Sequence, residues 1–149
     1  MAGLYFEEFT VGQTVKTAGR TISEDAIFSF AGLTGDYNQI HTDADFASKT
    51  QFGQRIAHGL LGMSIAVGLI MQTGLLEGTV LAFREIQEWK FVKPFLIGDT
   101  AHAVLTIAET KALPRIGGGS LIASVEVLNQ KDEVCQKGTL NLLVLSKPK

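Results

Sequence analysis

Apolar and polar positions change their spacing along the chain, and each spacing predicts a different kind of element. Residues 14–21 have the pattern of a β-strand. Ser23 then precedes two acidic residues, as the N-cap of a helix commonly does. The helix places Ile27 and Ala31 on one face, and we expect it to end at residues 32–35, because two glycines favour a turn there.

Residues 33–58 are predicted to be an irregular excursion with a short helix over residues 43–48. From residue 59 to about residue 75 the chain is apolar on all sides, which predicts a helix that is buried all round. Strand patterns follow at residues 80–91, 101–109, 121–128 and 134–145. The alternation of apolar and polar side chains is typical of an antiparallel sheet with one packed face.

These elements together predict an α+β fold, in which an antiparallel sheet of about five strands wraps around a long central helix. This is the hot-dog arrangement. The chain has 149 residues, of which 46% are apolar and 19% charged, and it contains no internal repeat or long linker. We therefore expect residues 1–149 to form a single domain with a full core.

Charge and cysteine content indicate which binding partners and which cellular compartment to expect. The net charge is −2 and the basic residues are interspersed with acidic ones, so we expect neither nucleic acid nor a membrane as partner. Cys135 is the sole cysteine and has no His or acid arranged to activate it, which indicates an inert thiol in a reducing compartment. The N-terminal residues lack the pattern of a signal peptide, and the apolar stretch 59–76 contains Ser64 and Gln72. We therefore predict a cytoplasmic protein.

Three polar side chains, Asp36, Asn38 and His41, lie within six residues of a predicted loop that precedes the apolar helix. Adding water to an enoyl thioester needs a base for the water, an acid for the α-carbon and a stabilised enolate oxygen. Asp36 and His41 can divide the proton transfers, and Asn38 can orient but cannot titrate. The free amides at the predicted helix start, where Gly59 lacks a Cβ, can hold the enolate oxygen, and Ser64 one turn later can add a hydroxyl.

Residues 35–41 read Gly-Asp-Tyr-Asn-Gln-Ile-His, and residues 56–61 read Ile-Ala-His-Gly-Leu-Leu. This double motif, with residues 92–100, resembles the MaoC-like dehydratase or R-specific enoyl-CoA hydratase (hydratase 2) family. The resemblance covers nearly the whole chain and implies a hot-dog fold with an excursion before the central helix. It also implies a lyase of fatty acid metabolism that hydrates trans-2-enoyl-CoA reversibly to (R)-3-hydroxyacyl-CoA.

Carried over by position, the resemblance makes Asp36 and His41 the catalytic pair that holds and activates the water. It makes Asn38 an orienting partner and Gly59 the amide of the oxyanion hole. The chain departs from the family at Gln39, where members usually have a proline that stiffens the loop. This departure concerns the rate and the substrate more than the type of reaction.

Each candidate residue also has a structural interpretation. Asp36 and Asn38 are common in turns, and His58 can pack and hydrogen-bond at the helix entrance as well as contact substrate. His102 lies in a predicted strand and is expected to be structural. We expect no metal and no other cofactor, because the spacings among the histidines and Cys135 match no compact ligand motif.

Two other functions stay open at this point. A hot-dog acyl-CoA thioesterase would be expected to supply a carboxylate from the central helix, and residues 60–76 contain none. A non-catalytic partner subunit that binds acyl chains would not need Asp36, His41 and Gly59. We expect an acyl-CoA thioester substrate and a homodimer, or a higher homo-oligomer, whose sheets join edge to edge. The sequence leaves open which basic residue meets the CoA phosphates: Arg84, Lys90, Lys93 or Arg115.

Overall fold

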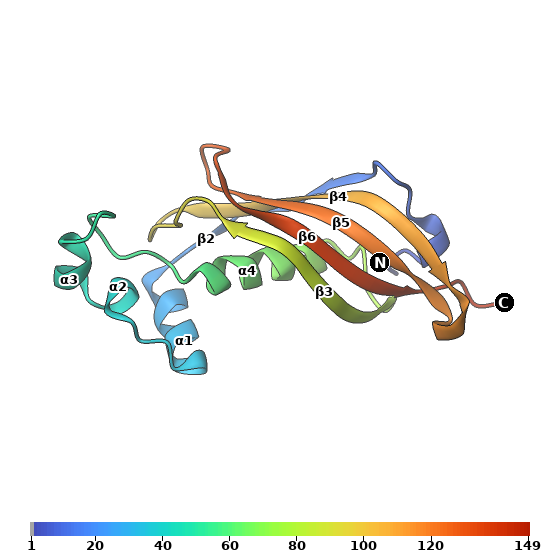
Figure 1. Ribbon diagram of the computed structural model, residues 1–149, viewed down its shortest axis with the longest axis horizontal. Coiled ribbons are helices and arrows are strands. Elements are labelled where there is room, and N and C mark those ends of the chain that lie inside the picture. The colour runs from blue at the N-terminus through green and yellow to red at the C-terminus, as the bar shows by residue number, and fades with distance from the viewer. Residues whose placement is uncertain (1) are drawn as a thin grey trace.

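The computed structural model describes residues 2–149. A curved antiparallel sheet lies against one long side of the central helix α4 (Gly59–Gln72), as Figure 1 shows. The strands run in the spatial order β1 (Thr14–Lys16), β4 (Thr100–Leu113), β5 (Gly118–Leu128), β6 (Val134–Leu145) and β3 (Val80–Phe91). The short strand β2 (Arg20–Thr21) pairs with β4 outside this order. The predicted α+β hot-dog fold is confirmed.

Within residues 2–149 the sheet has six strands where about five were predicted, because residues 14–21 form two short strands instead of one. Between them, Thr17 keeps the chain tied to β4: its amide donates to the Ala103 carbonyl oxygen at 2.9 Å, and its hydroxyl accepts from the Ala103 amide at 2.9 Å. The predicted strand is therefore interrupted between β1 and β2, although both pieces remain hydrogen-bonded to β4.

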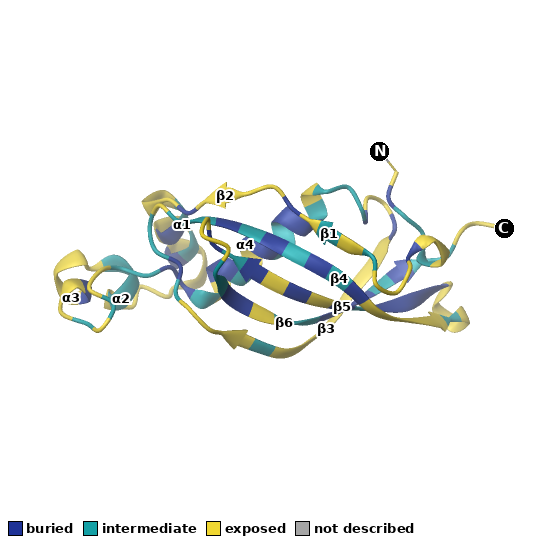
Figure 2. Ribbon diagram, turned by 90° about the horizontal axis from the view of Figure 1, so that it is seen from above, coloured by how far each residue is buried: buried dark blue, intermediate teal, exposed yellow. Residues whose placement is uncertain are grey.

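The core lies between the concave face of the sheet and α4. Alternate residues are buried over residues 100–107 of β4 and 121–127 of β5, which Figure 2 shows as a repeating band, while β6 also buries neighbouring residues at 135–136 and 140–142. They meet Leu61, Ile65 and Leu69 of the helix. Burying a side chain of this size stabilises the fold by about 1.5–3 kcal/mol, so the alternation predicted from the sequence determines which face of the sheet turns inward.

The prediction that the central helix is buried all round is wrong. The sheet covers one side of α4, while Leu60 on another side is 58% exposed and Ser64 is also exposed. The helix also ends at Gln72, before the predicted residue 75. Gly74 has a φ of 78°, a left-handed conformation that a helix cannot continue through.

The excursion before α4 projects beyond one end of the sheet, as Figure 1 shows. Helix α1 (Glu24–Thr34) begins as predicted, with the Ser23 hydroxyl accepting from the Ala26 amide, and is terminated by Gly35 at φ 82°. Two short helices follow, α2 (Gln39–Thr42) and the predicted α3 (Ala44–Ser48). The remaining elements are the 3₁₀ turns η1 (Phe6–Glu8) and η2 (Pro114–Ile116).

Across residues 2–149, no helix combines the length and hydropathy needed to cross a lipid bilayer. The apolar stretch that begins at Gly59 is instead the 14-residue helix α4.

Candidate active site

Three hydrogen bonds fold the excursion back onto the start of α4. The Ile56 amide donates to the Ile40 carbonyl oxygen at 3.2 Å, and the His41 ring donates from Nδ1 to the Ile56 carbonyl oxygen at 2.7 Å. The His58 ring donates from Nε2 to the main-chain carbonyl oxygen of Asp36 at 2.9 Å. The two sequence motifs are therefore held against each other by main-chain groups.

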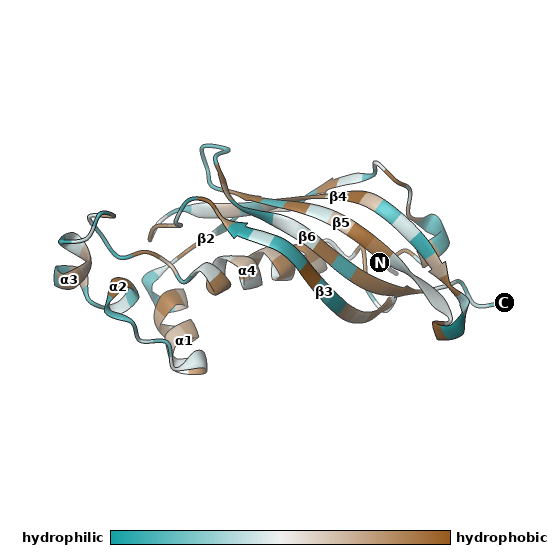
Figure 3. Cartoon of the chain, in the orientation of Figure 1, coloured by the Kyte–Doolittle hydropathy of each residue, from teal (hydrophilic) through white to brown (hydrophobic). Residues whose placement is uncertain are grey.

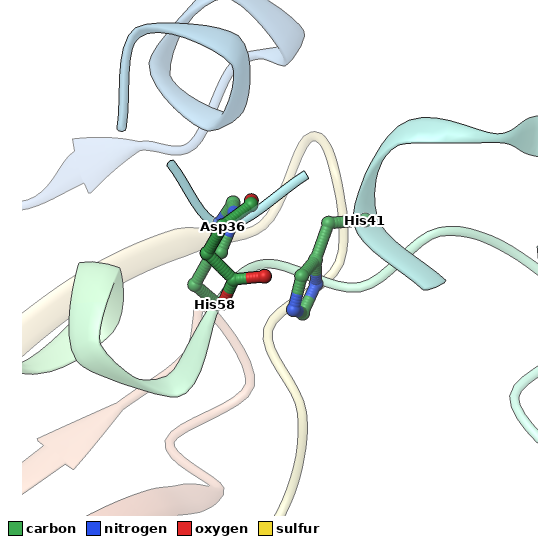
Figure 4. A group of neighbouring side chains, drawn as sticks. All are labelled: Asp36, His41 and His58. Atoms are coloured by element: carbon green, nitrogen blue, oxygen red, sulfur yellow. The ribbon is translucent and has the colours of Figure 1, made fainter. Parts of the chain in front are cut away.

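Asp36, His41 and His58 form one cluster. One potential ligand atom from each lies within 4.8 Å of the others, and Figure 4 shows the Asp36 carboxylate directed toward the His41 ring. The two imidazole rings are stacked, with centroids 3.9 Å apart. Asp36 is exposed, His41 is half-buried and His58 is buried, so the cluster reaches from the surface to the interior.

The hydrogen bonds fix the tautomers of both histidines. A carbonyl oxygen only accepts, so His41 carries its proton on Nδ1 and His58 carries its proton on Nε2. In the neutral ring, the lone pair of His41 is therefore on Nε2, where it can accept a proton. The other ring nitrogen of His58, Nδ1, is buried without a hydrogen-bond partner among residues 2–149.

The surroundings of His41 favour its neutral form. Burial lowers the pKa of the His41 imidazole, and the neighbouring His58 lowers it further, while the Ile56 carbonyl and the Asp36 carboxylate oppose this change. A histidine that is neutral near pH 7 and exposes Nε2 has the properties of a general base.

The turn roles considered for Asp36 and Asn38 are both present. The Asp36 side chain accepts from the Asn38 amide at 3.2 Å, and the Asn38 side chain caps α2 by accepting from the Ile40 amide at 3.1 Å. Helix α2 was not predicted from the sequence. It places His41 one turn beyond this cap, so that the ring faces residues 56–58.

A cavity of about 670 Å³ opens beside the start of α4. Its walls are mostly apolar: Phe52, Ile56, Ala57, Leu60, Phe91, Val92, Pro94 and Phe95 contribute, with His58, Gly59, Lys93 and Gln136. Gly59 is the first residue of the helix, and its amide is one of the first-turn donors that have no intrahelical acceptor. The cavity thus joins an apolar chamber to a backbone donor site, and His58 on its wall contacts the cluster of Asp36 and His41.

Ser64 lies apart from this arrangement. Its hydroxyl donates to the Leu60 carbonyl oxygen at 2.7 Å, and its side chain lines a second cavity, between α1 and α4. The fold therefore brings together Asp36, Asn38, His41, His58 and Gly59, and places the remaining predicted site residue on another face of the helix.

The cluster is poorly arranged for a metal ion. A metal takes the lone pair of an imidazole nitrogen in the plane of the ring, at about 2.0–2.1 Å for zinc. The rings of His41 and His58 are only 29° from parallel, so their free nitrogens do not point to one common position. This geometry suits proton transfer better than metal binding.

Two residues that line the cavity escaped sequence reasoning. Phe91 and Gln136 line the cavity from neighbouring positions on β3 and β6, although they lie far from both motifs in the sequence. His102, predicted to be structural, lies in β4 with its Nε2 3.5 Å from an Asp132 carboxylate oxygen. The pairing of β3 with β6 is what brings Phe91 and Gln136 together at the helix start.

In this hot-dog protein, a carboxylate and two imidazoles gather near the amino end of the central helix, and His58 also lines a mostly apolar cavity there. The model of the MaoC like domain matches residues 7–127. The chain belongs to this family.

Several relatives of the chain are named as hydratases or dehydratases. The (R)-specific enoyl-CoA hydratase of Rhodospirillum rubrum is 39% identical over 103 residues, which are 69% of this chain and 69% of that protein. Protein MaoC of Klebsiella aerogenes is 36% identical over 102 residues, which are 68% of this chain but 30% of that protein. The chain thus matches less than a third of the length of that relative.

Among solved structures, the monoamine oxidase regulatory protein from Archaeoglobus fulgius superposes with a TM-score of 0.91 at 34% identity. The match covers 99% of this chain and 98% of that one.

Proposed function

We propose that the protein catalyses the R-specific hydration of trans-2-enoyl-CoA to (R)-3-hydroxyacyl-CoA, and the reverse dehydration. One observation carries the proposal: the Asp36 carboxylate faces His41, whose Nε2 is free, beside the amino end of α4. The R configuration is supported by the relative from Rhodospirillum rubrum, whose name includes it.

In the proposed reaction, a water molecule lies between the Asp36 carboxylate and Nε2 of His41. His41 takes one proton from the water, the oxygen forms a bond with C3, and the C2–C3 double bond becomes an enolate. The enolate oxygen accepts from the Gly59 amide, which the helix dipole strengthens as a donor. His41 then returns the proton to C2, so water is added without any net change in the enzyme.

Asp36 has two tasks in this scheme. It accepts a hydrogen bond from the water and so orients the attacking oxygen, and its negative charge stabilises the imidazolium that forms on His41. Asn38 orients the turn that carries Asp36 and His41. Its main-chain amide donates to the Asp36 carboxylate, and its side chain caps α2, which contains His41. The apolar cavity accepts the acyl chain, and Lys93 on its wall, which also pairs with Glu133, supplies positive charge for a CoA phosphate.

The test is to incubate the protein with a short trans-2-enoyl-CoA and determine the configuration of the product. Asp36→Asn and His41→Ala should each lower kcat by about 10²–10⁴-fold without unfolding the chain. His102→Ala is the matched control, since it removes an imidazole from β4 and should retain activity. An S product would overturn the assignment, and release of free CoA would favour the thioesterase alternative.

A second, independent part of the proposal is that two copies join through β3. This strand has a neighbour on one side, β6, and presents several large apolar side chains that are 39–54% exposed: Val80, Leu81, Phe83, Ile86 and Phe91. A long apolar edge strand is normally covered in a native protein. In Figure 3, β3 carries hydrophobic stretches between hydrophilic ones.

Sedimentation of the protein at micromolar concentration should therefore report a dimer or a larger assembly. Replacing Phe83 and Ile86 together by Lys should shift it toward the monomer, because two desolvated charges oppose edge pairing. Leu33→Lys on α1 is the control, since that side chain is 84% exposed and away from β3. A monomer for the unmodified protein would refute this part.

A further inference from the structure

A buried glutamine ties the sheet to the first residue of α4. Gln136 of β6 is 3% exposed, and its Nε2 donates to the Gly59 carbonyl oxygen at 2.9 Å. Its Oε1 accepts from the indole Nε1 of Trp89 at 3.1 Å. Both ends of the amide are therefore satisfied by partners from two other elements, β3 and α4.

The sheet is built so that Trp89 can reach this glutamine. The register of β3 against β6 shifts between Gln87 and Lys90, and Glu88 in the shift has a positive φ of 51°. A bulge of this kind re-aims the side chains next to it. Trp89 packs over Gly138 of β6, where a Cβ would lie 2.6 Å from the indole Cε3.

Two more glycines make room for the same contact. At Gly62 a Cβ would lie 2.4 Å from Nε2 of Gln136, and at Gly59 it would lie 2.7 Å from Cδ1 of Phe91. Real Cβ atoms do not approach other atoms this closely. The helix start thus depends on glycine at two positions to bring the Gln136 amide and the Phe91 ring against its backbone.

An apolar residue at position 136 would fill this part of the core without the cost of burying an amide. What the amide adds to packing is the hydrogen bond that it donates to the first residue of α4. Its partner is the carbonyl of Gly59. Glycine has more backbone conformational freedom than any other residue type, and this one lies at the end of a helix, where fraying is common. A hydrogen bond from outside the helix fixes the orientation of the Gly59–Leu60 peptide.

We propose that Gln136, itself oriented by Trp89, is a positioning residue that holds the first turn of α4 so that the Gly59 amide points at the enolate oxygen. The inference rests on the proposed function, because it assigns the Gly59 amide to the oxyanion site. Neither residue touches the reacting atoms in this assignment. Gln136 binds the carbonyl of the Gly59–Leu60 peptide, and the Gly59 N–H belongs to the preceding peptide, so the effect passes through the backbone at the Gly59 Cα.

The test compares Gln136→Leu and Trp89→Phe in the full-length protein. Gln136→Leu removes the donor to Gly59 and should lower kcat by about 10- to 100-fold, as expected for a small misplacement of a catalytic group. KM should change much less. Trp89→Phe retains the donor and removes its support, so kcat should fall by about 2- to 10-fold. Trp89→Phe also keeps the proposal falsifiable if Gln136→Leu fails to fold.

Asn141→Leu is the matched control. Asn141 lies on the same strand, is 7% exposed and accepts a hydrogen bond from the Ser120 hydroxyl at 2.7 Å. Its loss removes a buried amide from β6 but no contact with the first turn of α4. It should lower stability and leave kcat unchanged, whereas a merely structural role for Gln136 predicts the same behaviour from both variants.

Backbone order parameters of Gly59 and Leu60, measured by NMR without substrate, separate this inference from the proposed function. In the unmodified protein and in Asn141→Leu they should be near 0.85, and in Gln136→Leu they should fall toward about 0.6. Unchanged order parameters in Gln136→Leu would overturn the positioning role, whatever happens to kcat. If the unmodified protein does not hydrate enoyl-CoA, the proposed function fails, and the order parameters still decide whether Gln136 holds the turn.

Discussion

Gly59→Ala is the substitution for which the structure makes the most specific prediction. The new Cβ would lie 2.7 Å from Cδ1 and 2.8 Å from Cε1 of Phe91. Carbon atoms in contact prefer a separation of about 3.5–4.0 Å, so the ring or the helix start has to move by about 1 Å. Under the proposed function, the methyl group would also narrow the approach of the thioester carbonyl to the Gly59 amide.

The effect on stability should be small. The Phe91 ring is 54% exposed and can turn toward solvent, which limits the cost of overpacking to about 1–3 kcal/mol. Alanine is also a better helix former than glycine by about 1 kcal/mol, which offsets part of that cost. A displacement of about 1 Å at a catalytic group lowers the rate by about 10²-fold, so kcat should fall far more than stability.

The measurements are kcat and KM with a short trans-2-enoyl-CoA, and the free energy of unfolding in urea. Gly68→Ala is the matched control, because Gly68 lies in the same helix and a Cβ there would meet nothing within 4 Å. That variant should be more stable by up to about 1 kcal/mol and retain full activity. If Gly59→Ala is as active as Gly68→Ala, the assignment of Gly59 to the oxyanion site is wrong.

The pKa of His41 is lowered mainly by burial, so the ring should titrate below 6.5 when followed by NMR, and further below in Asp36→Asn, which lacks the opposing carboxylate. The unfolded chain therefore binds a proton at His41 more readily than the folded chain does. The free energy of unfolding should decrease as the pH falls through 6.5 toward the pKa of the folded state. A titration midpoint of His41 above 6.5 in the folded protein would contradict this. Burial raises the pKa of Cys135 to about 11, so the native thiol should react with a disulfide reagent at pH 8 far more slowly than the unfolded chain. Equal rates in the two states would show that the thiol is accessible.

The elements that the sequence predicted well are those whose signal is local. Ser23 and Gly35 mark the two ends of α1 through their own conformations and side chains. Alternation within residues 121–128 and 134–145 identified two strands and their inner faces without knowledge of their neighbours. Such features depend on a few consecutive residues, so periodicity and capping are sufficient to recover them.

The central helix shows where this reasoning fails. Residues 59–72 are apolar on every side. This pattern indicates that the helix is buried, but it does not indicate which elements cover it. A single sheet covers one side of the helix, and Leu60 stays 58% exposed. The surroundings of a helix depend on elements elsewhere in the chain, which the residues of the helix do not specify.

The candidate site divides in the same way. The motif containing Asp36, Asn38 and His41 could be recognised because its polar residues lie close together in the sequence, and the amino end of α4 because an apolar run begins there. The tautomer of His41 depends on the Ile56 carbonyl, 15 residues away, and the support of Gly59 depends on Gln136, 77 residues away. The sequence alone determined which residue types are available for chemistry. The pairing of distant strands and the return of the excursion decided their orientation, because hydrogen bonds between remote segments leave no periodic pattern in the chain.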